Sequence, residues 1–166
     1  MKKAKRLVEV LKKQSMTIAL AESMTCGLAA YKLSKVPDVS DVLKGSIICY
    51  HESSKTELLS VPAKLIKHYT AESKQVTDAL ARKLSQKLTA DIYGAITGLA
   101  SPGGSETASK PVGTVFFSVV FKSDLYHHVH HFRGTPEEIR EKACEKMYAF
   151  ILSIVSRKKS KRKSTV

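Results

Sequence analysis

The stretch Thr17–Gly27, which reads T-I-A-L-A-E-S-M-T-C-G, constrains the fold of this chain more than any other stretch. Its apolar run stops abruptly at Glu22, Ser23 and Thr25, and a helix-like pattern begins directly afterwards. This order predicts a strand, a polar turn and a helix. In open α/β sheets such turns lie at the carboxyl ends of strands, where ligands bind, and the next helix offers unpaired N–H groups to an anion. We therefore expect Ser23 to take part in a chemical reaction at this site.

Similar apolar and amphipathic patterns recur along the chain. They predict strands over 17–21, 44–50, 90–97, 112–122 and 125–132, and longer helices over 4–14, 27–34, 73–89 and 135–155. The last two strands are close enough to form an antiparallel hairpin, whereas helix-length connections favour a parallel arrangement of the first three. The expected fold class is α/β, with a mixed, mostly parallel sheet of about five strands.

The length of 166 residues and the hydrophobic content of 43% predict one domain with one core. We expect this domain over residues 1–156 and a basic, disordered tail over 157–166. No apolar run reaches the ~20 residues that span a bilayer, so a cytoplasmic protein without membrane contact is expected. The three cysteines have no C-x-x-C spacing and indicate neither a disulfide framework nor a zinc site, with Cys49 and Cys144 expected in the core.

The formal net charge of +13 is concentrated at the end of the chain. The run Arg157–Lys163 holds six basic residues and no acid, which is about half of the imbalance. Such a run is typical of an appendage that makes weak, non-specific contacts with nucleic acid. The alternative is a solvated tail that aids solubility, and the basic charge taken by itself indicates nothing more than this.

Polar residues follow each of the first three predicted strands. Ser23 follows the first, Tyr50 and Lys55 the second, and Thr97 and Gly98 the third. Parallel strands would bring all of them to one edge of the sheet. A lysine kept neutral by burial can take the proton of a serine hydroxyl and activate it towards an amide or ester carbonyl, with Tyr50 relaying or holding the proton. The alternative is that Ser23 merely caps a helix and Lys55 is a solvated surface lysine.

The longest predicted loop, residues 98–111, is rich in glycine, serine and proline. Successive backbone N–H groups at Gly103, Gly104 and Ser105 could form a concavity for a phosphate. The alternative for this segment is a flexible surface loop.

Four histidines, at positions 127, 128, 130 and 131, fall on the last predicted strand. Alternation places His128 and His130 on one face and His127 and His131 on the other. No acidic or cysteine partner lies at a useful spacing, so we expect an exposed edge strand and no metal.

Four motifs, in this order along the chain, carry a family resemblance. They are A-E-S-M-T-C-G at Ala21–Gly27, Y-x-x-x-x-K at Tyr50–Lys55, T-G-L-A-S-P-G-G at Thr97–Gly104 and K-P-V-G-T-V at Lys110–Val115. Together they resemble the C-terminal domain of the competence-damage-inducible CinA family, over roughly Val8–Ile154. Stand-alone forms of that domain act as nicotinamide mononucleotide deamidases (PncC).

The resemblance implies a three-layer α/β/α fold, a serine/lysine amidohydrolase without metal or cofactor, and a homodimer. It assigns catalytic roles to Ser23, Lys55 and Tyr50, with Ser40 as a second serine that is either a partner or the true nucleophile. The substrate-binding residues that we expect are Glu22, Thr25, Thr97, Gly98, Gly103, Gly104 and Arg140. Met24 and Cys26 stand where the family usually has cysteine and glycine.

The expected function is hydrolysis of nicotinamide mononucleotide to nicotinate mononucleotide and ammonia, as part of pyridine nucleotide recycling. The alternative is a catalytically silent relative that binds a nucleotide and associates with nucleic acid through its basic tail.

Overall fold

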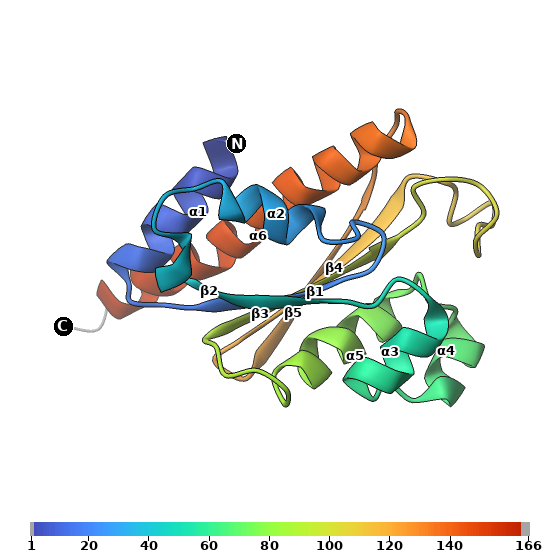
Figure 1. Ribbon diagram of the computed structural model, residues 1–166, viewed down its shortest axis with the longest axis horizontal. Helices are drawn as coiled ribbons and strands as arrows, with labels where there is room; N and C mark the ends of the chain where they lie inside the picture. The colour runs from blue at the N-terminus through green and yellow to red at the C-terminus, as the bar shows by residue number, and fades with distance from the viewer. Residues whose placement is uncertain (1, 164–166) are drawn as a thin grey trace.

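Strands and helices alternate along the chain, and the strands assemble into one five-stranded sheet covered by helices on both faces (Figure 1). The computed structural model describes residues 2–163, with side chains up to residue 156. The elements, in chain order, are α1 (Lys2–Lys13), β1 (Ile18–Glu22), α2 (Leu28–Ser34), the 3-10 helix η1 (Val39–Asp41), β2 (Leu43–Ile48), α3 (Glu52–Leu59), α4 (Ala63–Tyr69), α5 (Lys74–Leu84), β3 (Ile92–Gly98), β4 (Thr114–Phe121), β5 (Asp124–His131) and α6 (Pro136–Lys163).

The strand order in the sheet is β2-β1-β3-β4-β5. β1 pairs in parallel with both β2 and β3, whereas β4 is antiparallel to both β3 and β5. β4 therefore runs against the other four strands. This topology confirms the predicted mixed, mostly parallel sheet.

Helices α1, α2 and α6 cover one face of the sheet, and α3, α4 and α5 cover the other (Figure 1). Side chains of a strand alternate between the two faces, so one strand supplies both cores. Ile18 and Leu20 of β1 pack in the core under α1, α2 and α6, while Ala19 and Ala21 pack in the core under α5. The small alanine side chains leave room for α5 close to the sheet.

The carboxyl ends of β1, β2 and β3 lie at one edge of the sheet because these strands are parallel. Glu22, the last residue of β1, pairs with Ile48 at the end of β2 and with Ile96 of β3. The segments that follow these strands therefore begin side by side, as the polar residues after the three predicted strands indicated.

Local hydrogen bonds mark the start of α6. Thr135 N–H donates to Glu138 Oε2 (2.9 Å) and Glu138 N–H donates to Thr135 Oγ1 (3.2 Å), which is a capping box at the start of α6. α5 ends at Leu84, earlier than predicted. The apolar periodicity continued to Leu88 because this residue packs against the core from the turn after the helix.

Residues 157–163, which we assigned to the predicted tail, form the last turns of α6, which continues to Lys163. Lysine and arginine are good helix formers, the run contains no glycine or proline, and positive charge at the carboxyl end of a helix is favourable. Residues 164–166, also assigned to the tail, lie outside the described residues. None of the described helices is long and apolar enough to cross a membrane.

Cys49 and Cys144 are fully buried, as predicted. On the edge strand β5, His128 packs between Phe117 and Phe150, with ring centroids 6.1 and 5.5 Å from its own. Burial lowers the pKa of His128. Within the described residues, no three His, Cys, Asp or Glu side chains gather in a way that could hold a metal ion.

Candidate active site

Ser23 and Lys55 meet at the edge of the sheet. Ser23 follows β1 directly and Lys55 lies on α3. Lys55 is fully buried, and its Nζ lies 3.1 Å from Ser23 Oγ, 2.9 Å from the carbonyl oxygen of Cys49 and 3.1 Å from that of Tyr50. The two residues that sequence spacing paired are therefore in hydrogen-bond contact.

Burial lowers the pKa of Lys55, because the ammonium form loses its hydration. The charges of Glu72 and Glu52 oppose this shift only in part. Among the described residues, no carboxylate forms an ion pair with Lys55. A neutral amine has two N–H groups for the two carbonyls and a lone pair that can accept the Ser23 proton. This arrangement is that of a general base beside a nucleophile.

Glu22 builds the turn that carries Ser23. Its fully buried carboxylate accepts five hydrogen bonds, from Thr25 Oγ1, Gly27 N–H, Ala29 N–H, Ala30 N–H and Ser46 Oγ, at 2.8–3.1 Å. These bonds satisfy the first N–H groups of α2 and tie the turn to β2. Neither Glu22 nor Thr25 lines the cavity next to Ser23. Their predicted role in substrate binding is therefore corrected to that of a scaffold.

Two successive residues of this turn have left-handed backbone conformations, Cys26 with φ 48° and Gly27 with φ 91°. The backbone conformation favours glycine at position 27, where a Cβ atom would also lie 2.9 Å from Cδ1 of the exposed Ile48 side chain. Cys26 adopts its conformation at a steric cost, because its Cβ crowds the backbone.

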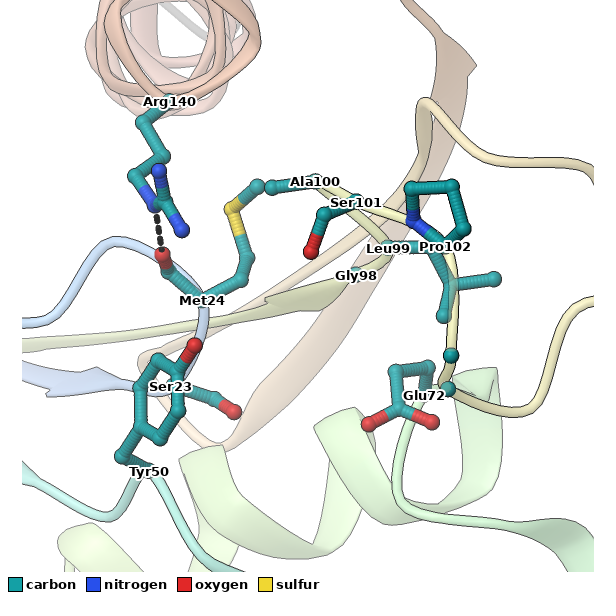
Figure 2. A pocket seen from close by; sticks show the side chains of 12 residues that line it. Ser23, Met24, Tyr50, Glu72, Gly98, Leu99, Ala100, Ser101, Pro102 and Arg140 are labelled. Atoms are coloured by element: carbon teal, nitrogen blue, oxygen red, sulfur yellow. Dashed lines mark hydrogen bonds between the residues drawn. The ribbon is translucent and has the colours of Figure 1, made fainter. Parts of the chain in front are cut away.

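A cavity of about 230 Å³ opens beside Ser23 (Figure 2). Its walls come from the turn after β1, from Tyr50, from Glu72, from the loop 98–104 and from Arg140 of α6. A second cavity, of about 420 Å³, shares Glu72, Gly103 and Gly104 with the first. Together the two offer a volume typical of a small-molecule site.

Arg140, on the last helix of the chain, also lines the cavity. Its Nε donates to the carbonyl oxygen of Met24 at 2.9 Å, which locks the arginine to the residue after Ser23 (Figure 2). Its terminal nitrogens donate to no other described residue, so they remain able to bind an anion.

The glycine-rich loop also forms part of the cavity wall. Gly98, Gly103 and Gly104 all line the cavity. A Cβ on Gly98 would come within 2.7 Å of a backbone oxygen of β4, so the strands approach too closely for any other residue. Gly103 N–H donates to Glu106 Oε1 at 2.8 Å, so a carboxylate of the chain itself occupies part of the predicted anion concavity.

Thr97 is not a cavity residue. It is fully buried, and its Oγ1 lies 2.7 Å from Thr77 Oγ1 of α5. Thr77 gives its own proton to the carbonyl of Ser73 at 2.6 Å, so Thr97 is the donor in the pair. The predicted contact of Thr97 with substrate is corrected: Thr97 joins β3 to α5 below the site.

Ser40 is also remote from the site. It is exposed in η1, just before β2 begins. Because Ile18 at the start of β1 pairs with Leu43 at the start of β2, Ser40 lies at the opposite edge of the sheet from Ser23. The structure does not bring Ser40 to Lys55, which leaves Ser23 as the serine of the pair.

Tyr50 contributes its backbone carbonyl to Lys55 and its ring to the cavity wall. The side chain is 58% exposed, and its hydroxyl donates to no described residue. Sequence reasoning missed two other wall residues. Met24 extends its side chain towards Ala100, and Glu72 faces Ser23 across the cavity (Figure 2). Met24 lies in the motif that carries Ser23 but was not assigned to substrate binding, and Glu72 lies in none of the motifs.

The fold and the site define an α/β protein with a buried serine–lysine pair at the carboxyl edge of three parallel strands. Residues 1–155 match the family described as the CinA C-terminal domain. The chain belongs to this family.

The most similar relatives include a CinA-like protein of Desulfotalea psychrophila, 39% identical over 82% of this chain and 33% of that protein. A putative competence-damage inducible protein of Bacillus cereus is 36% identical over 84% of the chain and 34% of that protein. The chain thus spans about a third of the length of these relatives. Among solved structures, a CinA superfamily protein from Escherichia coli superposes with a TM-score of 0.87 at 28% identity, covering 92% of this chain and 88% of that one.

Proposed function

We propose that the protein hydrolyses the carboxamide of nicotinamide mononucleotide, giving nicotinate mononucleotide and ammonia. The observation that carries the proposal is the buried Lys55 nitrogen 3.1 Å from Ser23 Oγ, next to a cavity. The resemblance of the site motifs to those of the deamidases supports the choice of substrate.

In the proposed reaction, Lys55 takes the proton of the Ser23 hydroxyl while Oγ attacks the carboxamide carbon. The lysine ammonium that forms is held by the carbonyls of Cys49 and Tyr50. When the tetrahedral intermediate collapses, the amide nitrogen takes this proton and leaves as ammonia, and an ester remains on Ser23. Water then attacks the ester, with Lys55 again as the base, and releases nicotinate mononucleotide and the free serine.

Backbone N–H groups can stabilise the oxyanion of the two tetrahedral intermediates. Met24 and Thr25 follow the nucleophile directly, and within the described residues their N–H groups donate no hydrogen bond. An N–H group after the nucleophile is a recurrent oxyanion donor in serine hydrolases. The terminal nitrogens of Arg140 are suited to the phosphate of the substrate.

Ammonia release from nicotinamide mononucleotide tests this proposal. At about 1 mM substrate, near the upper end of ordinary KM values, we expect the Ser23→Ala variant to lose activity by roughly 10³-fold or more. Ser40→Ala is the matched control, because it removes a hydroxyl at the other edge of the sheet, and it should retain full activity. Ammonia release by the unaltered protein that does not exceed that of Ser23→Ala would overturn the proposal.

A further inference from the structure

Glu72 places a carboxylate in the cavity wall that the serine–lysine chemistry does not use. It is half-buried, directly precedes Ser73 at the start of α5, and lines both cavities. Ser105 Oγ donates to Glu72 Oε2 at 2.5 Å and so orients the carboxylate. Among the described residues, nothing donates a hydrogen bond to its other oxygen, Oε1. The Oε1 oxygen of this oriented carboxylate is therefore available to bind a ligand.

The chain does not neutralise this charge by direct contact. The nearby Lys110 Nζ donates to Thr70 Oγ1, to Ser105 Oγ and to the backbone carbonyl of Glu72, at 2.7–3.0 Å, rather than to the carboxylate. No ion pair within the described residues includes Glu72. The field of Glu72 does reach the reaction centre, since its charge acts against the lowering of the Lys55 pKa that burial causes.

Arg140 gives the cavity a positive side as well. Figure 2 shows Arg140 and Glu72 on different sides of the space beside Ser23. A ligand that spans this space meets a guanidinium at one end and a carboxylate at the other. This pair of charges fits a zwitterion, with an anionic group towards Arg140 and a cationic group towards Glu72.

We propose that Glu72 is a specificity-determining residue that selects mononucleotides with a cationic ring over those with a neutral ring. The inference rests on the proposed function, in which the carboxamide at Ser23 brings its pyridinium ring into the cavity that Glu72 faces. A neutral ring would leave the Glu72 charge partly desolvated with only Lys110, on the other side of Ser105, as a nearby counter-charge, which costs binding free energy.

Nicotinamide mononucleotide and its reduced form test the inference as a matched pair. They share the carboxamide, ribose and phosphate, and differ only in the ring, which is cationic and aromatic in the oxidised form and a neutral dihydropyridine in the reduced form. Calorimetry on a Ser23→Ala background, in which turnover is blocked, should give roughly tenfold tighter binding of the oxidised form. Adding Glu72→Gln should bring the ratio of the two dissociation constants close to one, whereas Glu72→Asp, which keeps the charge, should retain much of the preference. Glu57→Gln removes the same charge from an exposed position on α3 and should leave the ratio unchanged.

Equal binding of the two forms by the Ser23→Ala protein would overturn the inference, and so would a preference that persists in the Glu72→Gln variant. Either result leaves the deamidase proposal standing if the unaltered protein releases ammonia. Failure of both forms to bind, together with no ammonia release, would overturn the proposed function itself.

Discussion

Lys55 is the residue on which the proposed chemistry depends. Its nitrogen lies against two carbonyls and one hydroxyl, so a neutral amine there can donate to both carbonyls and turn its lone pair to the hydroxyl. The Ser23–Lys55 pair could be predicted because both residues follow strands that end at the same edge. Glu72 could not be predicted, because it belongs to no motif and reaches the cavity only through the packing of α4 and α5.

Cys26 has a strained backbone close to Ser23, the proposed nucleophile, since its φ of 48° suits glycine better than cysteine. Replacing it with glycine should raise the free energy of unfolding by about 0.5–1 kcal/mol, after the entropy cost of glycine in the unfolded chain is subtracted. Urea denaturation measures the change. Cys26→Ala keeps the Cβ atom and should bring no gain; equal stabilisation by alanine and glycine would show that backbone strain is not the cause.

At the scale of elements, the periodic segments were predicted well and their ends less well. The Thr135 capping box marked the start of α6 because its two hydrogen bonds are local. The end of α5 was predicted too late because Leu88, in the following turn, continues the apolar pattern. Short α2 depends on a tertiary feature, the Glu22 carboxylate beneath its first turn, which no local pattern encodes.

Glu22→Gln should therefore destabilise the protein strongly. The amide has an NH₂ group in place of one carboxylate oxygen, so a donor would face buried N–H groups that need an acceptor. We expect the free energy of unfolding to fall by at least about 3 kcal/mol. Ser46→Ala removes only one of the five donors and should cost about 1 kcal/mol. Thermal or urea unfolding measures both variants. Similar, small losses for the two would contradict the role of Glu22 as the centre of the turn.

At the scale of the whole molecule, parallel strand pairing decides which predicted residues meet. It brings the segments after β1, β2 and β3 together, and it sends Ser40, which lies before β2, to the opposite edge. The candidate site could thus be predicted from the order of strands and helices. The exclusion of Ser40 and Thr97 required the register and the packing of the finished fold.

No described residue of the cavity wall comes from the last turns of α6. All the described residues that line the cavity precede Ser156, and the buried Ile154 and Val155 remain when the chain is truncated after Ser156. Truncation there should leave the rate of ammonia release within about twofold of the full chain, because surface changes away from a site have small effects. A loss of tenfold or more would mean that the tail takes part in the reaction.

The same two chains test the predicted contact with nucleic acid. Duplex DNA should bind the full chain weakly and more weakly as salt rises, because phosphate contacts release counterions, and truncation should remove this binding. Equal, salt-insensitive binding by both chains would exclude a role of the tail.

The protonation state of Lys55 tests the account most directly. In a heteronuclear NMR titration of the lysine side chains, the resonance that disappears in the Lys55→Met variant should titrate below the ordinary pKa of 10.5, because burial disfavours the ammonium form. The low-pH limb of kcat/KM for ammonia release should fall at the same pH, since the reaction needs the neutral amine. A Lys55 resonance that titrates at or above 10.5 would contradict the account, because the buried nitrogen beside Ser23 would then carry a proton where the nucleophile needs a base.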